Sequence, residues 1–242
     1  MIRLAAVGDL HFGPDLAGTL RSAFEDLSDR ADVLLLAGDL TRVGDPAEAA
    51  ALADELRDLP IPGVAVLGNH DYHSDRSDDV RKLVEESGIR VLEGDSAVLD
   101  LGDDRVGVAG VKGFGGGFAG ACGSDFGEPE MKSFVRHTKE VAASLESALG
   151  SLDTEVRVAL MHYAPTEQTL QGERLEIYPF LGSYLLGEAV DRAGASLIVH
   201  GHAHRGSEKG VTPGGTPVRN VALPVIHRPY NVYRLEDGHA LA

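Results

Sequence analysis

The sequence predicts an α/β fold in which a mainly parallel sheet is covered by helices. Short runs of almost uninterrupted apolar residues alternate with segments in which apolar residues recur at the helical spacing. Continuous apolar runs are typical of strands that are buried on both faces, as in parallel sheets. Signals for the start of a helix, such as Asp45 followed by Pro46, stand between the runs. Repeated strand and helix units of this kind predict a layered α/β architecture.

Three of these units make up the first part of the chain. Strands are expected at residues 4–7, 33–37 and 64–67. The helices that follow them are expected around residues 20–27, from Pro46 to Leu59, and from Ser77 to a stop at Gly88. Because a helix returns the chain to the start of the next strand, these strands should run parallel.

The pattern changes from Arg90 onwards. Short strand candidates at 91–92, 97–101 and 106–111 are separated by glycines, which is typical of adjacent antiparallel strands. The glycine-rich loop at 113–118 lacks the Lys-Ser/Thr of a P-loop, so a tight structural connection is favoured over an anion site. The remaining elements are expected as a helix at 128–152 with Met131 facing inward, a strand at 156–161, a helix at 185–193, and strands at 196–199, 218–222 and 231–235.

The composition suits one globular domain. The 242 residues are 43% hydrophobic, and no linker-like tract or repeat interrupts them, so we expect a single domain over residues 1–242. The apolar runs are too short to span a bilayer, and the first residues lack the features of a signal peptide. The lone Cys122 permits no intramolecular disulfide. These observations favour a cytoplasmic protein.

The charge limits the partners that we expect. The formal net charge of −16 disfavours stable binding of nucleic acid, because such binding needs clustered Lys and Arg. An acidic protein can still act on phosphate compounds where bound cations reverse the local charge. The sequence does not determine the oligomeric state, and a homo-oligomer is one of the possibilities.

Five of the apolar runs end in side chains that can bind a metal ion. These side chains are Asp9 and His11, Asp39, Asn69 with His70, His162, and His202 with His204. The carboxyl ends of strands in an open α/β sheet share one edge, so we expect these residues to meet there. The alternative is that these polar residues only terminate strands and turns. That alternative would explain any one of the positions, but not all five together. The donors are oxygens and imidazoles without thiolates, which leaves Mn, Fe and Zn open.

On these residues the chain resembles the calcineurin-like metallophosphoesterases, and among them the bacterial phosphodiesterases more than the protein phosphatases. The signatures occur in order along nearly the whole chain: Asp9-Leu10-His11, Gly38-Asp39, Gly68-Asn69-His70-Asp71, His162, and Gly201-His202-Ala203-His204. The resemblance implies a four-layer αββα sandwich, in which two mixed β-sheets are flanked by helices and the metal site lies at the C-terminal ends of the strands. It also implies a hydrolase that acts on ester bonds.

The resemblance further implies a site for two divalent or trivalent metal ions and assigns their ligands. Asp9, His11, Asp39 and His204 would hold one ion, and Asp39, Asn69, His162 and His202 would hold the other. Asp39 would be the bridge. Two such ions can lower the pKa of a bridging water, which then acts as the nucleophile, and stabilise the charge of an in-line displacement. His70 would not coordinate the metals and would act as the general acid.

Asp71 and Arg42 complete the candidate catalytic set. In the protein phosphatases of this superfamily the Gly-Asp motif continues with a second Asp and an Arg, whereas this chain reads Gly38-Asp39-Leu40-Thr41-Arg42. Arg42 takes the place of that Asp, which argues against a phosphoprotein substrate. We hypothesise that the guanidinium of Arg42 lies at the rim of the site and holds phosphate, and an exposed loop arginine is the alternative.

The expected function is hydrolysis of a small phosphoester, with a phosphodiester or a nucleotide-type compound as the substrate. A metal-stabilised interaction module without catalysis is one alternative, which the presence of His70 disfavours. A nuclease is another, which the charge disfavours. Tyr163 and His73 are candidate substrate contacts, whereas His200 is expected behind the metal ligands.

Overall fold

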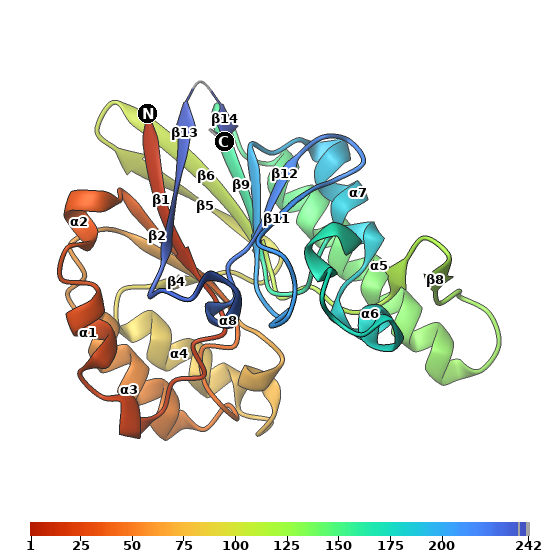
Figure 1. The fold of residues 1–242 in the computed structure, drawn as a ribbon, viewed down its shortest axis with the longest axis horizontal. Helices are drawn as coiled ribbons and strands as arrows, with labels where there is room; N and C mark the ends of the chain where they lie inside the picture. Colours follow the sequence, from red (N-terminus) through yellow and green to blue (C-terminus); the bar gives the residue numbers. More distant parts are fainter. Residues whose placement is uncertain (237, 241–242) are drawn as a thin grey trace.

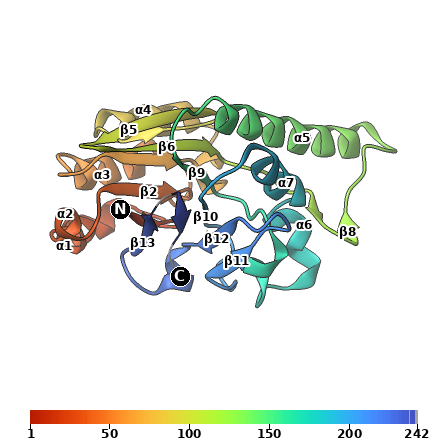
Figure 2. The same ribbon diagram turned by 90° about the horizontal axis from the view of Figure 1, so that it is seen from above.

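The computed structural model describes residues 1–236 and 238–240, and its strands form two six-stranded sheets that pack face to face (Figures 1 and 2). The strands of the first sheet are β1 (Ile2–Val7), β2 (Val33–Ala37), β3 (Gly63–Val66), β4 (Arg90–Val91), β13 (Asn231–Glu236) and β14 (His239–Ala240). The strands of the second sheet are β5 (Asp95–Leu101), β6 (Asp104–Val111), β9 (Val156–Met161), β10 (Leu197–His200), β11 (Lys209–Val211) and β12 (Pro217–Asn220). The strand orders are β14-β13-β1-β2-β3-β4 and β11-β12-β10-β9-β6-β5.

Helices cover the outer face of each sheet (Figure 2). Those on the first sheet are α1 (Thr19–Ala23), α2 (Leu27–Arg30), α3 (Pro46–Leu56) and α4 (Ser77–Glu86), and those on the second are α5 (Pro129–Gly150) and α7 (Tyr184–Ala193). The shorter elements are the hairpin of β7 (Gly117–Phe118) and β8 (Ala121–Cys122), and the helices α6 (Tyr178–Leu181) and α8 (Leu223–Ile226).

Three apolar layers hold the sandwich together. Along β2, Leu34 and Leu36 pack against the helices of the first sheet, whereas Val33 and Leu35 pack against the second sheet. The third layer lies between the second sheet and the helices α5 and α7. Both faces of these strands are therefore shielded from water, which explains why apolar residues do not alternate with polar ones along them. The predicted four-layer αββα sandwich of two mixed sheets is confirmed.

The parallel strands bring their carboxyl ends to one edge of the sandwich. In the first sheet β1, β2, β3 and β4 are mutually parallel, and β13 pairs antiparallel with β1. In the second sheet β6, β9, β10 and β12 are parallel, and β5 and β11 pair antiparallel at its two ends. The loops that leave β1, β2, β3, β9 and β10 therefore start from the same side of the molecule.

The sequence predicted three adjacent antiparallel strands after Arg90, and this prediction is wrong for the first of the three. β4 pairs parallel with β3 in the first sheet, and only β5 and β6 form an antiparallel pair. Gly94, with φ of 84°, lies in the turn that carries the chain from one sheet to the other, and its N–H donates to the carbonyl of Gly110 at 2.7 Å. Few L-residues adopt that conformation, so glycine permits the change of sheet.

Two helix predictions need correction. The segment expected as one helix around residues 20–27 is split into α1 and α2, although Leu20, Phe24 and Leu27 are all buried as expected. At the break, Asp26 accepts a hydrogen bond from the hydroxyl of Tyr230 at 2.7 Å, a tertiary contact that the sequence pattern did not reveal.

In α5 the inward assignment of Met131 is wrong, because this residue is 45% exposed. The first turns of α5 project beyond the two six-stranded sheets (Figure 2). Among the described helices, none combines the length and the apolar character that crossing a bilayer requires.

Candidate metal centre

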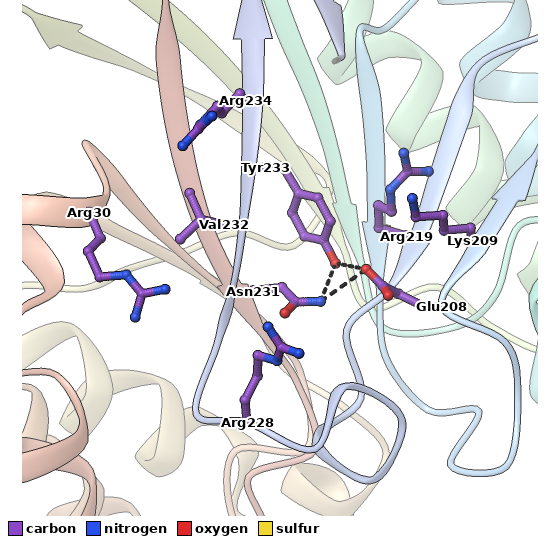
Figure 3. A pocket seen from close by; sticks show the side chains of 9 residues that line it. All are labelled: Arg30, Glu208, Lys209, Arg219, Arg228, Asn231, Val232, Tyr233 and Arg234. Atoms are coloured by element: carbon purple, nitrogen blue, oxygen red, sulfur yellow. Dashed lines mark hydrogen bonds between the residues drawn. The ribbon is translucent and has the colours of Figure 1, made fainter. Parts of the chain in front are cut away.

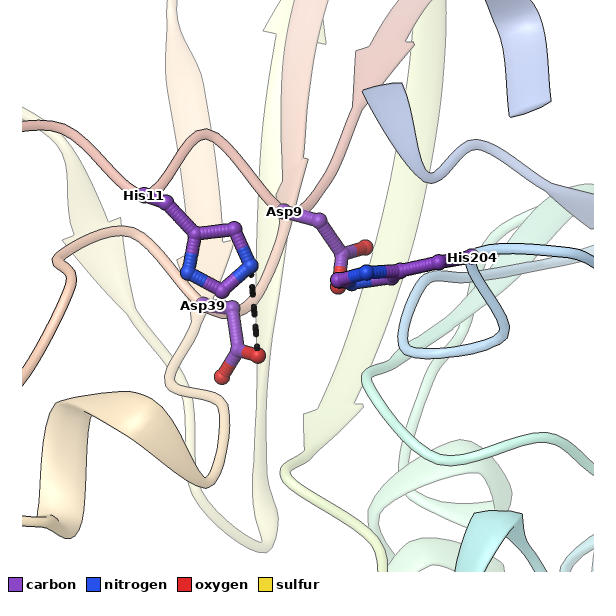
Figure 4. A group of neighbouring side chains, drawn as sticks. All are labelled: Asp9, His11, Asp39 and His204. Carbon is purple, nitrogen blue, oxygen red and sulfur yellow. Dashed lines mark hydrogen bonds and ion pairs between the residues drawn. The ribbon is translucent and has the colours of Figure 1, made fainter. Parts of the chain in front are cut away.

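The structure brings the predicted ligands together in two neighbouring groups at the carboxyl ends of the strands. One group contains Asp9, His11, Asp39 and His204 (Figure 4), and the other contains Asp39, His162 and His202. Within each group every residue offers a ligand atom that lies within 4.8 Å of the others. Asp39 belongs to both groups, so its carboxylate lies between them.

The first group has the donors and the unsatisfied atom that a metal site needs. Nε2 of His204 lies 2.8 Å from Oδ1 of Asp9, and Nε2 of His11 lies 3.8 Å from Oδ2 of Asp39. Nε2 of His11 is buried and has no hydrogen-bond partner among the described residues. A buried nitrogen without a partner is costly, and a metal ion at this position would satisfy it.

In the second group, backbone carbonyls orient the imidazoles. Nδ1 of His162 donates to the carbonyl of Ala37 at 2.9 Å, which leaves Nε2 free to bind a metal. That Nε2 lies 3.0 Å from Oδ1 of Asn69, the amide that the sequence places at this site. Nε2 of His202 donates to the carbonyl of Phe180 at 3.2 Å, which leaves its Nδ1 as the ligand atom.

Four of the predicted ligands adopt a backbone conformation that is uncommon for residues other than glycine. Their φ angles are 58° for Asp9, 43° for His11, 48° for Asp39 and 69° for His202. The loops after β1 and β2 hold part of this geometry, since the N–H of Asp9 donates to Gly38 O at 2.9 Å and the N–H of His11 donates to Asp39 O at 3.0 Å. Left-handed backbone of this kind concentrates at functional sites, where the surrounding structure sustains its cost.

The glycines beside the ligands are required by close packing of the carboxylates. A Cβ on Gly68 would lie 2.1 Å from Oδ1 of Asp39, and a Cβ on Gly201 would lie 2.3 Å from Oδ2 of Asp9. Both distances are far below a van der Waals contact, so any side chain there must displace a ligand oxygen.

We therefore expect Gly201→Ala to weaken metal binding by about 10- to 100-fold, the usual cost of disturbing a group that orients a metal ligand. Titration of the metal-free protein with Mn or Zn, followed by calorimetry, measures the change. Gly150→Ala is the matched control, because a Cβ on Gly150 meets nothing within 4 Å. Equal affinity in the two variants would contradict the packing argument.

The electrostatics keep the carboxylate ionised and two of the imidazoles neutral. Burial by itself would raise the pKa of Asp39, but the neighbouring His162 and the N–H of His70 outweigh it and hold that pKa well below its ordinary value. Burial lowers the pKa of His11, and it lowers the pKa of His202 to about 3. Burial alone would lower the pKa of His162, but the attraction of the Asp39 carboxylate is stronger, and the net effect raises this pKa to about 9. The centre therefore attracts cationic charge beside Asp39.

His70 stands at the edge of the two groups with its ring orientation fixed. Its Nδ1 lies 2.6 Å from the carbonyl of Arg42, which can only accept, so Nδ1 carries a proton. Nε2 faces the centre and lies 4.0 Å from Oδ2 of Asp39, and 44% of the side chain is exposed. The backbone N–H of His70 donates to Oδ1 of Asp39 at 2.8 Å.

Asp71 is fully buried and holds two loops together. Its carboxylate accepts from the N–H of Leu40 at 3.1 Å, from the N–H and the hydroxyl of Thr41 at 2.8 and 2.6 Å, and from the N–H of Gly68 at 2.8 Å. Burial raises the pKa of Asp71, although these donors oppose the shift. The carboxylate thus ties the loop after β2 to the loop after β3.

Asp71→Asn should lower the free energy of unfolding by roughly 1–3 kcal/mol, because the amide NH₂ would face N–H donors and leave one of them unpaired. Urea denaturation measures this change. Asp75→Asn serves as the control, since Asp75 is exposed and lies four residues further along. A stability equal to that of the control variant would be inconsistent with the network.

Arg42 is engaged with the protein itself. Its guanidinium pairs with Asp15 at 2.6 Å, and its Nε donates to the carbonyl of His11 at 3.0 Å. The structure therefore places Arg42 beside the ligand loop, where its terminal nitrogens already have a carboxylate partner. His73 is exposed on the turn after His70.

His200 lies behind the ligands, as expected. It is completely buried, its Nδ1 donates to the carbonyl of Gly201 at 2.7 Å, and its Nε2 lies 2.8 Å from the hydroxyl of Thr169. In the 113–118 loop the N–H of Gly116 donates to the carbonyl of Pro179 in α6, and the N–H of Gly117 donates to that of Gly182 just after α6, which agrees with a structural connection.

Lys112 is the residue near the centre that the sequence reasoning missed. Its Nζ lies 4.9 Å from the ring centroid of Tyr72, 5.2 Å from that of Phe114 and 5.6 Å from that of Tyr163. The Tyr163 ring in turn lies 4.4 Å from the ring of His202. Lys112 directly follows β6, so a search for the first polar residue after each apolar strand would have included it. We call Lys112, Tyr72, Phe114 and Tyr163 the aromatic rim.

A known protein is similar in sequence to part of this chain. Over 80 residues the chain is 36% identical to a probable cyclic nucleotide phosphodiesterase from Synechococcus sp.. That alignment covers 29% of this chain and 31% of the relative, so it spans less than a third of the relative's length.

Two solved structures share the fold. Phosphopantetheinyl hydrolase from Mycobacterium tuberculosis superposes with a TM-score of 0.71 at 16% identity, over 99% of this chain and 98% of its own. GAP50, the anchor in the inner membrane complex of Plasmodium, superposes with a TM-score of 0.55 at 11% identity, over 92% of this chain and 72% of its own. At these identities the likeness concerns the fold alone. The family model of the calcineurin-like phosphoesterases, however, matches residues 2–206, and the chain therefore belongs to that family.

Proposed function

We propose that this protein hydrolyses a small phosphoester, of the phosphodiester or nucleotide type, at a centre of two metal ions. The observation that carries the proposal is the position of Asp39 in both ligand groups. Oδ2 of Asp39 lies 3.8 Å from Nε2 of His11, whereas its Oδ1 lies 3.3 Å from Nε2 of His162. The two oxygens of one carboxylate thus serve separate groups, which is the arrangement that a bridging ligand requires.

The residues present fit such metal ions. Asp9, His11, Asp39 and His204 would hold one ion, and Asp39, Asn69, His162 and His202 would hold the other. Their oxygens and imidazoles suit Mn, Fe or Zn, and the unpartnered Nε2 of His11 would gain a partner. When bound, such ions activate water and neutralise charge on the phosphoryl group.

His70 is the residue that we assign to proton transfer. The carbonyl of Arg42 holds the proton on Nδ1, so the exchangeable proton of the charged ring resides on Nε2, which faces the centre. A proton at that atom can be delivered to the oxygen of a leaving group as it departs. The partial exposure of the ring leaves room for the substrate beside it.

We assign supporting roles to Asp71 and Arg42. Asp71 is enclosed by donors from the loops after β2 and β3, so it positions Asp39 and His70 and does not touch the substrate. Arg42 orients His70 through its carbonyl, and its guanidinium would have to leave Asp15 before it could hold a phosphate.

The aromatic rim supports a substrate that carries both negative charge and a planar or apolar group. Lys112 offers a positive charge and the half-buried Phe114 offers a ring, whereas the buried Tyr163 packs between Lys112 and His202. A nucleotide-type phosphodiester has both features. The name of the Synechococcus relative, a probable cyclic nucleotide phosphodiesterase, supports the same class.

A substrate panel tests the proposal. The metal-free protein is supplied with Mn, Fe or Zn and assayed on bis(p-nitrophenyl) phosphate, p-nitrophenyl phosphate, cyclic nucleotides and pyrophosphate. We expect metal-dependent turnover with diesters preferred to monoesters. Absence of bound metal under all three conditions would overturn the assignment, and turnover of monoesters alone would overturn the substrate class.

A further inference from the structure

A second polar cavity lies away from the metal centre, between the edges of the two sheets. It has a volume of about 700 Å³ and is lined by residues of β11, β12 and β13 together with Arg30 and Arg228 (Figure 3). β14 pairs only with Leu235 and Glu236 of β13, so the first half of β13 has a free outer edge among the described strands. β11 is the end strand of the other sheet. None of the lining residues is a predicted metal ligand.

The lining of this cavity is basic although the chain as a whole is acidic. Five cationic side chains line it, and they are Arg30, Lys209, Arg219, Arg228 and Arg234. Within the described residues, Arg30 pairs with Asp26 at 3.5 Å, and the other four have no carboxylate at ion-pair distance. In a chain with a formal net charge of −16, such a concentration of unpaired positive charge is a distinct local feature.

The single carboxylate among the lining residues, Glu208, offsets only one of the five positive charges. Oε1 of Glu208 accepts from the hydroxyl of Tyr233 at 2.9 Å and from the amide of Asn231 at 3.0 Å (Figure 3). Both donors are neutral. Glu208 is held in place by them and keeps its own negative charge, which leaves a surplus of positive charge among the five cations of the lining.

Arg219 is the buried member of the cluster and has unused donors. It is only 8% exposed, and its Nη1 donates to the carbonyl of Val218 at 2.9 Å. Its Nε is buried and has no hydrogen-bond partner among the described residues. The guanidinium carbon lies 5.7 Å from the ring centroid of Tyr233. A guanidinium has five N–H donors, and an unsatisfied one in the interior is costly.

We propose that this cavity binds a phosphate-bearing small molecule with at least two negative charges. Guanidinium groups bind phosphate oxygens in pairs, and several cations around one cavity suit a multiply charged anion. The volume lies within the range of small-molecule sites. An extended polyanion such as nucleic acid fits less well, because the rest of the acidic surface would repel it.

The test uses methylenediphosphonate, whose P–C–P linkage is not hydrolysed, titrated into the metal-loaded protein by calorimetry. Lys209→Gln combined with Arg228→Gln removes two exposed cations of the cavity, and neither residue belongs to the metal centre. Wild type should show a binding event that this double variant loses or weakens by at least about tenfold. Any binding of the diphosphonate at the metal centre occurs in wild type and in the double variant alike, so it does not contribute to the difference between them.

Two controls make the result specific. Arg57→Gln combined with Lys82→Gln removes two exposed cations that do not line the cavity, and it should leave the titration unchanged. Arg219→Lys keeps the buried charge but loses the planar fork, and it should also weaken binding. Equal isotherms for wild type and the cavity variant, or an equal loss in the surface control, would overturn the proposal. Binding of citrate as tight as that of the diphosphonate would overturn the assignment to phosphate.

The proposal is independent of the proposed hydrolysis. The cavity variant should turn over bis(p-nitrophenyl) phosphate at the wild-type rate. If wild type has no such activity but binds the diphosphonate through Lys209 and Arg228, the function of the metal centre is misassigned and the cavity site stands.

Discussion

Asp39→Ala is expected to remove bound metal and phosphoesterase activity together. Asp39 is the residue common to both ligand groups, and its two oxygens face different imidazoles. Loss of its negative charge leaves His162 and His11 without the carboxylate that they share. Because metal ions supply several kcal/mol of transition-state stabilisation, we expect the rate to fall by about a thousandfold or more.

Metal content per chain and turnover of a diester substrate are the two measurements. Asp39→Asn is informative beside Asp39→Ala, because it keeps an oxygen to accept the N–H of His70 but removes the charge. Asp100→Ala is the matched control, since the Asp100 side chain is 81% exposed and lies on β5. Full metal content with normal turnover in Asp39→Ala would show that the two groups are not a metal centre.

His70→Ala is expected to keep metal but to lose turnover of substrates with poor leaving groups. His70 belongs to neither ligand group, and its Nε2 faces the centre. General acid catalysis contributes roughly 10²- to 10⁴-fold, so an alkyl diester should be hydrolysed more slowly by that factor. A nitrophenyl ester needs little protonation as its leaving group departs, and its rate should change much less.

The comparison of the two leaving groups is the decisive measurement for His70. His239→Ala is the matched control, because it removes an exposed imidazole that belongs to neither ligand group. A uniform loss with both leaving groups would assign His70 to binding or to metal positioning. An unchanged rate with the alkyl diester would remove it from the mechanism.

The sequence predicted that polar residues at the ends of the apolar strands lie close together, and this prediction succeeded for a physical reason. Strands buried on both faces must be apolar throughout, so the first polar residue after each strand is conspicuous in the sequence. Asp9, Asp39, Asn69 and His162 stand at such positions, and the structure places each of them close to another member of this set. Lys112 follows β6 in the same way, and it was overlooked because Lys is not a usual metal ligand.

The partners of individual side chains were not predictable from the sequence. Arg42 pairs with Asp15, which is 27 residues away, and Asp71 is enclosed by N–H groups from a loop about 30 residues away. Local periodicity carries no information about such contacts. They depend on how the loops after β1, β2 and β3 fold over one another.

The sequence by itself determined the α/β class, the strand ends that carry the predicted ligands, and through its ordered motifs the family. These follow from local patterns, because burial imposes apolar strands and metal binding needs particular donor types. Only the tertiary structure decided the left-handed backbone of Asp9 and Asp39, the placing of β4 and β5 in different sheets, and the basic cavity around Arg219. Arg30, Arg219 and Arg228 are far apart in the chain, and they meet because two sheet edges face one another.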